Sequence, residues 1–281
     1  MHETELSWML NMQSIRSPTL DAFFMLLRFF DSKEFIFVLI PAIWLWFGAK
    51  NGLRLFYVLF LNGAINDSLK ALFASLRPCR ILPELGMYPI DGFGFPSGAA
   101  QATMLLTALY LYYVKTPYKW LIACLYFFFV SFSRVYLGVH FISDVLGGWI
   151  VGLGLFSAYI AAKGSLEKKL HGKNFYKLIG LHLFVTLSLP LLLPNHTAVE
   201  YMGASIGLAI GLILSHIFKQ KWKKPKGIQE YTLRFICGVG GIFFFNTALP
   251  IPSFLRVLIS CVWLSYGCIS LLYRKAFTSK A

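Results

Sequence analysis

Runs of hydrophobic residues, separated by short polar connections, repeat along almost the whole chain. Nine of them reach or approach the roughly 20 residues that a helix needs to cross the hydrocarbon core of a membrane. They lie at about 34–49, 52–75, 98–114, 119–137, 143–162, 176–193, 201–218, 231–248 and 253–273. The pattern therefore predicts an all-α protein, a polytopic bundle of about nine transmembrane helices.

The first 32 residues follow a different pattern, because charged residues interrupt the apolar ones. Arg16, Asp21 and Arg28 lie between Leu10 and Phe30. This mixture is typical of amphipathic helices in the membrane interface, and a short re-entrant helix is the alternative. A Lys-rich stretch at 163–177 marks a second boundary. We therefore expect an interfacial segment at 1–32, a transmembrane core at 33–163 and a further four-span region of unknown role at 164–281.

The composition is that of a membrane protein. Of the 281 residues, 57% are hydrophobic and only 14% are charged, which is unlike an ordinary soluble domain. The net charge of +14 comes from lysines and arginines between the hydrophobic runs, so it gives no support to nucleic-acid binding. The five cysteines show no paired spacing, and the chain has no metal-binding, Walker or nucleotide motif. We expect no cofactor and no metal.

The basic residues also predict an orientation, because cytoplasmic loops are enriched in lysine and arginine. Of the 26 basic residues, 17 lie at the ends of the odd-numbered spans, whereas the opposite connections hold only Arg77 and Arg80. The 17 are Lys50, Arg54, Lys115, Lys119, Lys163, Lys168, Lys169, Lys173, Lys177, Lys219, Lys221, Lys223, Lys224, Lys226, Arg274, Lys275 and Lys280. The N-terminus is therefore expected outside and the C-terminus in the cytoplasm.

Three polar clusters fall on the predicted outer side. Lys70 and Arg77 are seven residues apart, about two helical turns, so both point toward one outer pocket and imply an anion there. Pro96-Ser97-Gly98 begins a predicted helix, whose N-terminal amides attract oxyanions. His140 and Asp144 are one helical turn apart, so the carboxylate can orient the imidazole for nucleophilic attack.

Together the clusters resemble the signatures of the type 2 phosphatidic acid phosphatase superfamily, which are KxxxxxxRP, PSGH and SRxxxxxHxxxD. The sequence matches the first from Lys70 to Pro78 and the third from Ser133 to Asp144. The resemblance implies a helix bundle in which His140 attacks phosphorus, forms a phosphohistidine and is oriented by Asp144. It also implies a set of phosphate-binding residues, namely Lys70, Arg77, Ser97, Gly98 and Arg134.

The second signature departs from the family pattern, because Ala99 stands where the family has the histidine that protonates the leaving group. General acid catalysis is worth about 10²–10⁴-fold, so its loss weakens an enzyme without abolishing turnover. A replacement acid is conceivable at Gln101 through a water, or at Glu84 or Asp91. The sequence does not distinguish natural divergence at Ala99 from a laboratory change made to trap substrate.

The resemblance implies a lipid phosphatase or phosphotransferase. The basic loops put its site at the outer leaflet, and the compact loops favour a bacterial inner membrane with the site facing the periplasm or exterior. The implied substrates are phosphorylated membrane lipids such as undecaprenyl diphosphate, phosphatidylglycerol phosphate or phosphatidic acid. Phosphate, or vanadate as its mimic, is the expected site ligand. The alternative is a catalytically silent relative that binds or transports lipid phosphates, which Ala99 and the unexplained region 164–281 favour.

Overall fold

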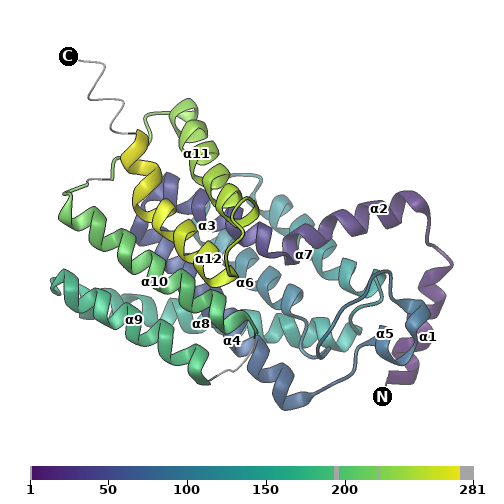
Figure 1. The fold of residues 1–281 in the computed structure, drawn as a ribbon. Coiled ribbons are helices and arrows are strands. Elements are labelled where there is room, and N and C mark those ends of the chain that lie inside the picture. Colours follow the sequence, from purple (N-terminus) through teal and green to yellow (C-terminus); the bar gives the residue numbers. More distant parts are fainter. Residues whose placement is uncertain (1, 193–195, 221, 273–281) are drawn as a thin grey trace. The chain divides into compact units, whose positions relative to one another are not determined.

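The computed structural model of the chain consists of helices joined by short connections (Figure 1). It describes residues 2–192, 196–220 and 222–272, and within these ranges it contains no strand, in agreement with the predicted all-α class. The α-helices are α1 (His2–Gln13), α2 (Pro18–Leu26), α3 (Lys33–Phe47), α4 (Ala49–Phe73), α5 (Pro78–Ile81), α6 (Gly98–Tyr113), α7 (Lys119–Tyr136), α8 (Ile142–Leu170), α9 (Phe175–Leu192), α10 (His196–Ile217), α11 (Ile228–Thr247) and α12 (Ser253–Val262). The 3₁₀ turns are η1 (Leu27–Asp31) and η2 (Pro83–Leu85), and η3 (Trp263–Gly267) is π-helical.

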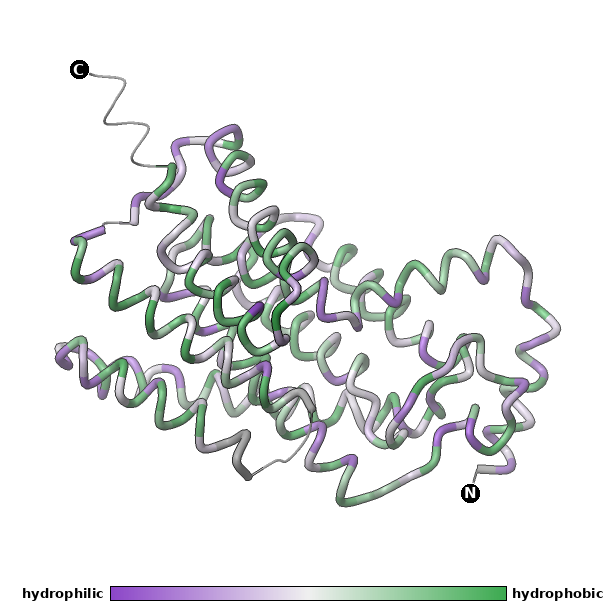
Figure 2. Tube along the Cα trace, viewed as in Figure 1, coloured by the Kyte–Doolittle hydropathy of each residue, from purple (hydrophilic) through white to green (hydrophobic). Residues whose placement is uncertain are grey.

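Each predicted hydrophobic run coincides with a helix, from α3 to the end of the described chain. Figure 2 shows the hydrophobic residues following most of these helices. Four of them are long and apolar enough to cross a membrane, at Lys119–Tyr136, Ile142–Leu170, Ala198–Ile217 and Ser253–Leu272. Phe175–Ser188 is a shorter apolar helix. The count of nine spans and the orientation of the termini stay predictions, and Lys221, Arg274, Lys275 and Lys280 lie outside the described residues.

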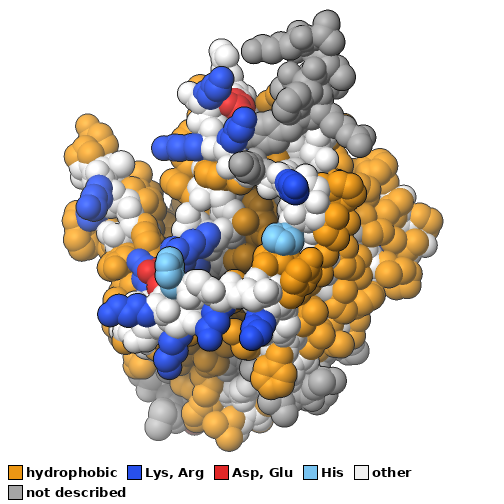
Figure 3. All heavy atoms as spheres, turned by 90° about the vertical axis from the view of Figure 1, so that its left-hand side faces the viewer, with side chains coloured by type: hydrophobic (Ala, Val, Ile, Leu, Met, Phe, Trp, Pro, Cys, Tyr) orange, Lys and Arg blue, Asp and Glu red, His pale blue; other side chains and the backbone are white. Residues whose placement is uncertain are grey.

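The outer surface is apolar in the way that a lipid-facing surface is. Large hydrophobic side chains such as Ile150, Phe184 and Ile236 are more than half exposed. Figure 3 shows broad hydrophobic patches on the face in view. Soluble monomers rarely leave contiguous apolar patches of this kind exposed, so the surface is consistent with an integral membrane protein.

The chain forms two compact units. The first consists of Met1–Phe35 with Leu61–Lys169, and the second of Ile36–Phe60 with Leu170–Ala281. These units divide the chain differently from the predicted segments 1–32, 33–163 and 164–281. The N-terminal segment belongs to the first unit, whereas α3 and the first half of α4 group with the C-terminal region. All of the predicted site residues lie in the first unit.

In the first unit the N-terminal helices pack against the predicted core. α1 contacts α7 and η2, and α2 and η1 contact α7 (Figure 1). The charges that interrupt the apolar pattern find partners there, because Arg16 donates to the carbonyls of Leu85 and Tyr136 at 2.9 and 3.0 Å. Asp21 accepts a 2.7 Å hydrogen bond from the Tyr136 hydroxyl. Whether the segment also lies in the membrane interface stays a prediction.

A seam of small residues brings α8 close to α6. A Cβ atom at Gly148 would lie 2.6 Å from the Ser97 carbonyl, and one at Gly152 would lie 2.4 Å from the Gln101 carbonyl. Two glycines four residues apart allow two helix backbones to approach in this way. The consequence for the site is that the backbone amide of Ser97 reaches the carbonyl of Asp144, at 2.9 Å.

In the second unit glycines also allow helices to pack closely, and a polar side chain, that of His182, is buried. Gly203, Gly207 and Gly211 of α10 lie against α12 and η3, where a Cβ atom would meet backbone or side-chain atoms within 2.6 Å. The buried His182 has a partner at each ring nitrogen, the hydroxyl of Tyr57 at 2.6 Å and the carbonyl of Ser205 at 2.9 Å. A carbonyl can only accept, so Nε2 donates to Ser205 and Nδ1 accepts from Tyr57.

Candidate active site

His140 lies in the tight turn between α7 and α8, and the backbone of Arg134 holds this turn in place. The carbonyl of Arg134 accepts hydrogen bonds from the amides of both Val139 and His140, at 3.2 and 3.3 Å. Gly138 takes a left-handed φ of +71°, and a Cβ atom there would lie 1.9 Å from the Leu85 carbonyl. Only glycine fits this position, so the turn is built to pack against the loop that precedes α6.

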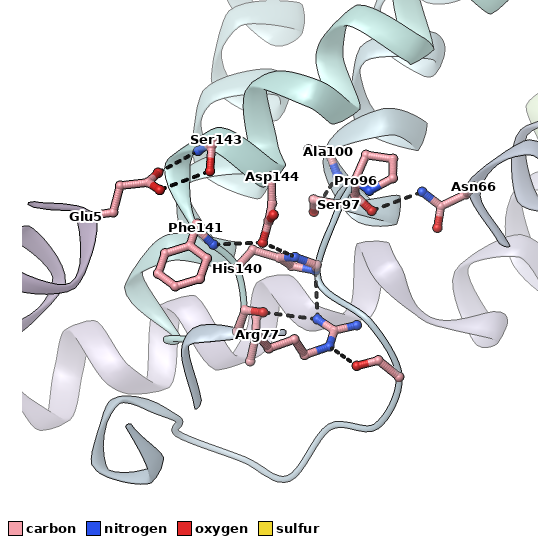
Figure 4. A network of polar contacts seen from close by, with 12 residues as sticks. Glu5, Asn66, Arg77, Pro96, Ser97, Ala100, His140, Phe141, Ser143 and Asp144 are labelled. Carbon is pink, nitrogen blue, oxygen red and sulfur yellow. Dashed lines mark hydrogen bonds and ion pairs between the residues drawn. The ribbon is translucent and has the colours of Figure 1, made fainter. Parts of the chain in front are cut away.

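Asp144 lies in the first turn of α8 and contacts the histidine one turn before it. Its Oδ2 atom is 3.3 Å from Nδ1 of His140 and accepts a 3.0 Å hydrogen bond from the Phe141 amide. Both side chains are buried, with exposed fractions of 3% for His140 and 1% for Asp144. The predicted pairing of imidazole and carboxylate is therefore present in the structure (Figure 4).

Arg77 contacts the other ring nitrogen of the same histidine. Its Nη1 atom lies 3.0 Å from Nε2 of His140 and donates to the Val139 carbonyl at 3.0 Å, and its Nε atom donates to the Gly92 carbonyl at 3.1 Å. Arginine can only donate, so Nε2 must accept and Nδ1 must carry the proton toward Asp144. Figure 4 shows Asp144, the imidazole and Arg77 side by side in this order. The tautomer leaves the lone pair for attack on Nε2.

The electrostatic surroundings keep this imidazole neutral. Burial lowers the pKa of His140 well below its ordinary value, and the positive charges of Arg77, Lys70 and Arg134 lower it further. A neutral imidazole is the form that can act as a nucleophile. The same three cations are those that the resemblance assigns to phosphate binding, so their charges act at the position where the histidine would react.

Ser97 and Gly98 begin α6 beside this pair. Ser97 is the N-cap of the helix, and its Oγ accepts a 3.4 Å hydrogen bond from the Ala100 amide. The first turn of a helix leaves backbone amides without intrahelical partners, which makes it a site for anions. A Cβ atom at Gly98 would lie 2.8 Å from Oδ1 of Asn66, so the glycine also admits the Asn66 side chain.

Arg134 is the most deeply buried cation of the set, with an exposed fraction of 1%. Its Nε atom donates to Oγ of Ser133 at 3.0 Å, and its Nη1 atom forms a 3.1 Å ion pair with Oδ2 of Asp31. Its Nη2 atom has no hydrogen-bond partner among the described residues. A buried guanidinium nitrogen without a partner is costly, and an oxyanion would satisfy it.

Lys70 lies one turn from the end of α4 and is partly buried. Its charge acts on His140, which indicates that it faces the same region. The structure thus brings Arg77, Arg134, His140, Asp144, Ser97 and Gly98 together and adds Lys70 through its charge. Among the described residues there is no group of three or more His, Cys, Asp or Glu side chains that could hold a metal ion.

A methyl group, that of Ala99, stands at the position of the missing histidine. It is buried, with an exposed fraction of 3%. Gln101 is fully committed to an amide network. Its Nε2 donates to Asn62 O and Oδ1 at 2.9 and 3.1 Å, and its Oε1 accepts from Asn66 at 2.9 Å. Asp91 is paired with Arg80 at 2.6 Å and its side chain is exposed. Neither arrangement favours these residues as a replacement acid, and nothing in the contacts of Glu84 does so.

Two carboxylates at the site come from the N-terminal segment, and motif spacing gave no sign of either. Asp31 pairs with Arg134, as described above. Glu5 accepts hydrogen bonds from the amide and the hydroxyl of Ser143, at 2.8 and 3.0 Å, in the first turn of α8 (Figure 4). The signal that could have pointed to them is the presence of charged residues in an otherwise apolar segment, since such charges are usually paired.

The sequence of this region matches a known protein family. Residues 51–166, which contain all three clusters, match the sequence model of the PAP2 superfamily. This segment belongs to the PAP2 superfamily. The PAP2 region contains the turn of His140, the first turn of α6 and the loop of Arg77. It ends near the boundary of the first compact unit.

Several named proteins are similar to the chain. It is 25% identical to the lipid phosphate phosphatase delta of Arabidopsis thaliana over 73% of its length, and 28% identical to the undecaprenyl-diphosphatase of Sulfolobus acidocaldarius over 48%. It is 32% identical to phosphatidylglycerophosphatase B of Bacillus subtilis over 42%. These matches span 53%, 68% and 59% of the three relatives, so the chain covers only about half of the Arabidopsis protein.

A solved structure has a similar fold. The first transmembrane PAP2-type phosphatidylglycerolphosphate phosphatase from Bacillus subtilis superposes with a TM-score of 0.50 and 26% identity. The match covers 61% of this chain and 89% of that one. About three fifths of this chain therefore share the helical fold of that membrane phosphatase, whereas the rest of the chain lies outside the match.

Proposed function

We propose that this protein is a membrane lipid phosphatase that removes a phosphoryl group from a lipid through a phosphohistidine at His140. The observation that carries the proposal is the tautomer of the neutral His140 imidazole, which lies in a buried site with three cations. Its Nδ1 proton faces Asp144, and its Nε2 lone pair faces Arg77. The names of the relatives, all of them lipid phosphatases, support the same reaction class.

In the first step Nε2 of His140 forms a bond to phosphorus, and the bond from phosphorus to the leaving oxygen breaks with its electron pair on that oxygen. Asp144 stabilises the positive charge that develops on the imidazole. In the structure Arg77 donates to Nε2. It must therefore shift its hydrogen bond to a phosphoryl oxygen as the substrate binds, before Nε2 can attack. Water then attacks phosphorus, the bond from phosphorus to Nε2 breaks with its electron pair returning to the ring, the proton of the water passes to solvent, and phosphate is released. Because the transition state spreads charge over the equatorial oxygens, the cations supply most of the catalysis.

The substrate class follows from Ala99. An alkoxide that leaves a phosphomonoester needs a proton, whereas a phosphate that leaves a diphosphate is a much better leaving group. A site without the family histidine therefore favours a lipid diphosphate such as undecaprenyl diphosphate over phosphatidic acid. The name of the Sulfolobus relative is consistent with this substrate. We place the reaction at the outer leaflet of a bacterial inner membrane, on the strength of the basic loops.

Ala99 also favours a second candidate function, in which the protein binds or transports lipid phosphates without hydrolysing them. In this case the same buried cations hold the phosphate group, and the region after residue 163 contributes to movement of the lipid. Tight binding without release of phosphate distinguishes this function from the first.

The test is release of phosphate from lipid diphosphate in proteoliposomes, with the wild-type protein, His140→Ala and a protein-free control. The phosphatase proposal predicts release by the wild type and none above the control by His140→Ala. Equal release in all three samples contradicts it. Ala99→His is expected to speed release of phosphate from phosphatidic acid by up to about 10²–10⁴-fold and to change the reaction of the diphosphate less. Ala99→Gln is the control of similar size.

A further inference from the structure

Asn66 is the residue of α4 that reaches the start of α6. It is buried and lies one helical turn before Lys70. Its Nδ2 atom donates to the carbonyl of Pro96 at 3.2 Å and to Oε1 of Gln101 at 2.9 Å. The Asn66 side chain is therefore bound to the residue that directly precedes Ser97, the N-cap of α6.

Two backbone carbonyls determine the orientation of this amide group, because a carbonyl can only accept a hydrogen bond. Nε2 of Gln101 lies 2.9 Å from the carbonyl of Asn62, so Nε2 is the donor there and Oε1 faces Asn66. The Pro96 carbonyl and this Oε1 atom both accept, so Nδ2 of Asn66 faces them. Oδ1 of Asn66 lies beside the first residue of α6, where a Cβ atom at Gly98 would approach it to 2.8 Å.

The first turn of α6 is thus held from two sides. On the side of α8, the amide of Ser97 donates to the carbonyl of Asp144 at 2.9 Å. On the side of α4, Asn66 holds the carbonyl of Pro96. Figure 4 shows Asn66 and Asp144 on opposite sides of this turn. These two contacts determine where the backbone amides of the turn lie relative to Lys70 on α4.

The amide network does more than join two helices. Buried amides are costly unless their donors are satisfied, and a satisfied network favours one arrangement of its members. Displacement of Asn66 would break its hydrogen bonds to Pro96 and Gln101 together. An apolar side chain of similar size could fill the space between α4 and α6, but it could not hold the Pro96 carbonyl. The network therefore fixes the loop that leads into α6 as well as the packing of the helices.

We propose that Asn66 is a positioning residue for phosphoryl binding. It holds the first turn of α6 so that the amides of this turn and the ammonium group of Lys70 bind the same phosphoryl group. The role rests on the proposed function, because it concerns the phosphate-binding residues of that site. Binding of a phosphate mimic tests it without turnover.

A purely structural role for Asn66 makes a different prediction. Loss of a structural hydrogen bond lowers the melting temperature, but the protein that remains folded binds phosphate with its ordinary affinity. Loss of a positioning residue weakens phosphate binding in the folded protein itself. An affinity measured well below the melting temperature therefore separates the two roles.

The experiment measures the Kd of orthovanadate by calorimetry for the full-length wild type, Asn66→Leu and Asn246→Leu, each at a temperature at which it is folded. Asn246 is the matched control, because its Nδ2 atom links α11 to α12 by a 2.8 Å hydrogen bond to Ser260, in the second unit. Asn66→Leu should raise the Kd by about 10–100-fold, as removal of groups that orient metal ligands does. Asn246→Leu should leave it unchanged. An unchanged Kd for Asn66→Leu, or an equal rise in both variants, would overturn the proposal.

Gly98→Ala provides a second variant at the same contact. The added Cβ atom would meet Oδ1 of Asn66 at 2.8 Å, and this oxygen cannot move away while Nδ2 keeps its two hydrogen bonds. We expect Gly98→Ala to raise the Kd of orthovanadate. In combination with Asn66→Ala it should cause no further rise, since both changes release the same turn. Losses that multiply in the double variant would overturn the role of Asn66, and this comparison serves if Asn66→Leu does not fold.

Failure of this proposal can be distinguished from failure of the phosphatase function. Equal release of phosphate from lipid diphosphate by the wild type and His140→Ala would overturn the phosphatase function, whatever the affinities for orthovanadate. Wild-type affinity in Asn66→Leu, together with wild-type turnover above that of His140→Ala, would overturn the role of Asn66 alone. A wild-type protein that does not bind orthovanadate would overturn the phosphate site on which both depend.

Discussion

Nη1 of Arg77 lies 3.0 Å from Nε2 of His140, so a permanent cation donates its hydrogen bond to the nitrogen that would attack phosphorus. This relationship fixes the tautomer from one side while Asp144 fixes it from the other. It also means that the lone pair is covered until an anion draws the guanidinium away. A phosphoryl group does this directly, because its oxygens compete for the same donor.

We expect Arg77→Lys to lower kcat/KM for the lipid substrate by about 10²–10³-fold, the usual cost of losing one positioned donor at a developing negative charge. A lysine retains the charge but cannot contact the Gly92 carbonyl, the Val139 carbonyl and His140 at once. Arg80→Lys is the matched control, because Arg80 forms an exposed pair with Asp91 and should tolerate the change. Steady-state phosphate release measures both, and equal rates for the two variants would refute the role of Arg77.

The pH dependence of the reaction should reflect the lowered pKa of His140, which burial and then the charges of Arg77, Lys70 and Arg134 cause. The nucleophile must be neutral, so activity should persist as the pH falls through about 6.5, the ordinary value for histidine, and be lost only at lower pH. Lys70→Met removes one of these charges and should move this acidic limb to higher pH. A wild-type limb at or above 6.5 would contradict the account.

The same shift has a consequence for stability. The folded protein binds the His140 proton less readily than the unfolded chain does. The stability that neutral His140 contributes is therefore complete above the unfolded value of about 6.5 and is lost as the pH falls from there toward the folded pKa. His140→Gln should make the melting temperature less sensitive to pH in this window.

Glu5 should matter both for stability and for the site, because it caps the first turn of α8 from a distance. Its carboxylate accepts from the amide and the hydroxyl of Ser143, one residue before Asp144. We expect Glu5→Ala to reduce the free energy of unfolding by about 0.5–2 kcal/mol, as loss of an N-cap does, and to lower kcat. Glu3→Ala, at an exposed position of the same helix, is the control. Identical melting temperatures and rates for the two variants would show that the contact has no effect.

The hydrophobic pattern predicted the helices well, because each run from 34 onward appears as a helix, and most ends agree within three residues. The exceptions are α8, which continues eight residues past the predicted end at 162, and α10, which begins five residues before the predicted start at 201. The pairing of His140 with Asp144 was also predictable, since one helical turn separates them. Spacing alone could not reveal the pairing of Arg77 with His140. That contact depends on a close approach of the loop at 82–94 to the turn at Gly138, which only the folded chain shows.

Contacts between segments far apart in the chain could not be predicted from the sequence. Asp31 and Arg134 are 103 residues apart, and Glu5 and Ser143 are 138 apart. No periodicity or motif links positions at such separations, so the sequence predicts an interfacial segment at 1–32 but not its contacts with the core. The amide of Gln101 is held by Asn62 and Asn66, partners that local spacing does not indicate.

The central claim is that His140 becomes phosphorylated, and rapid quenching of the wild-type protein with radiolabelled lipid diphosphate tests it most directly. The account predicts a transient protein-bound phosphoryl group that is labile in acid and stable in base, maps to the peptide containing His140 and is absent in His140→Ala. Release of phosphate without such an intermediate, or the same label in His140→Ala, would contradict it.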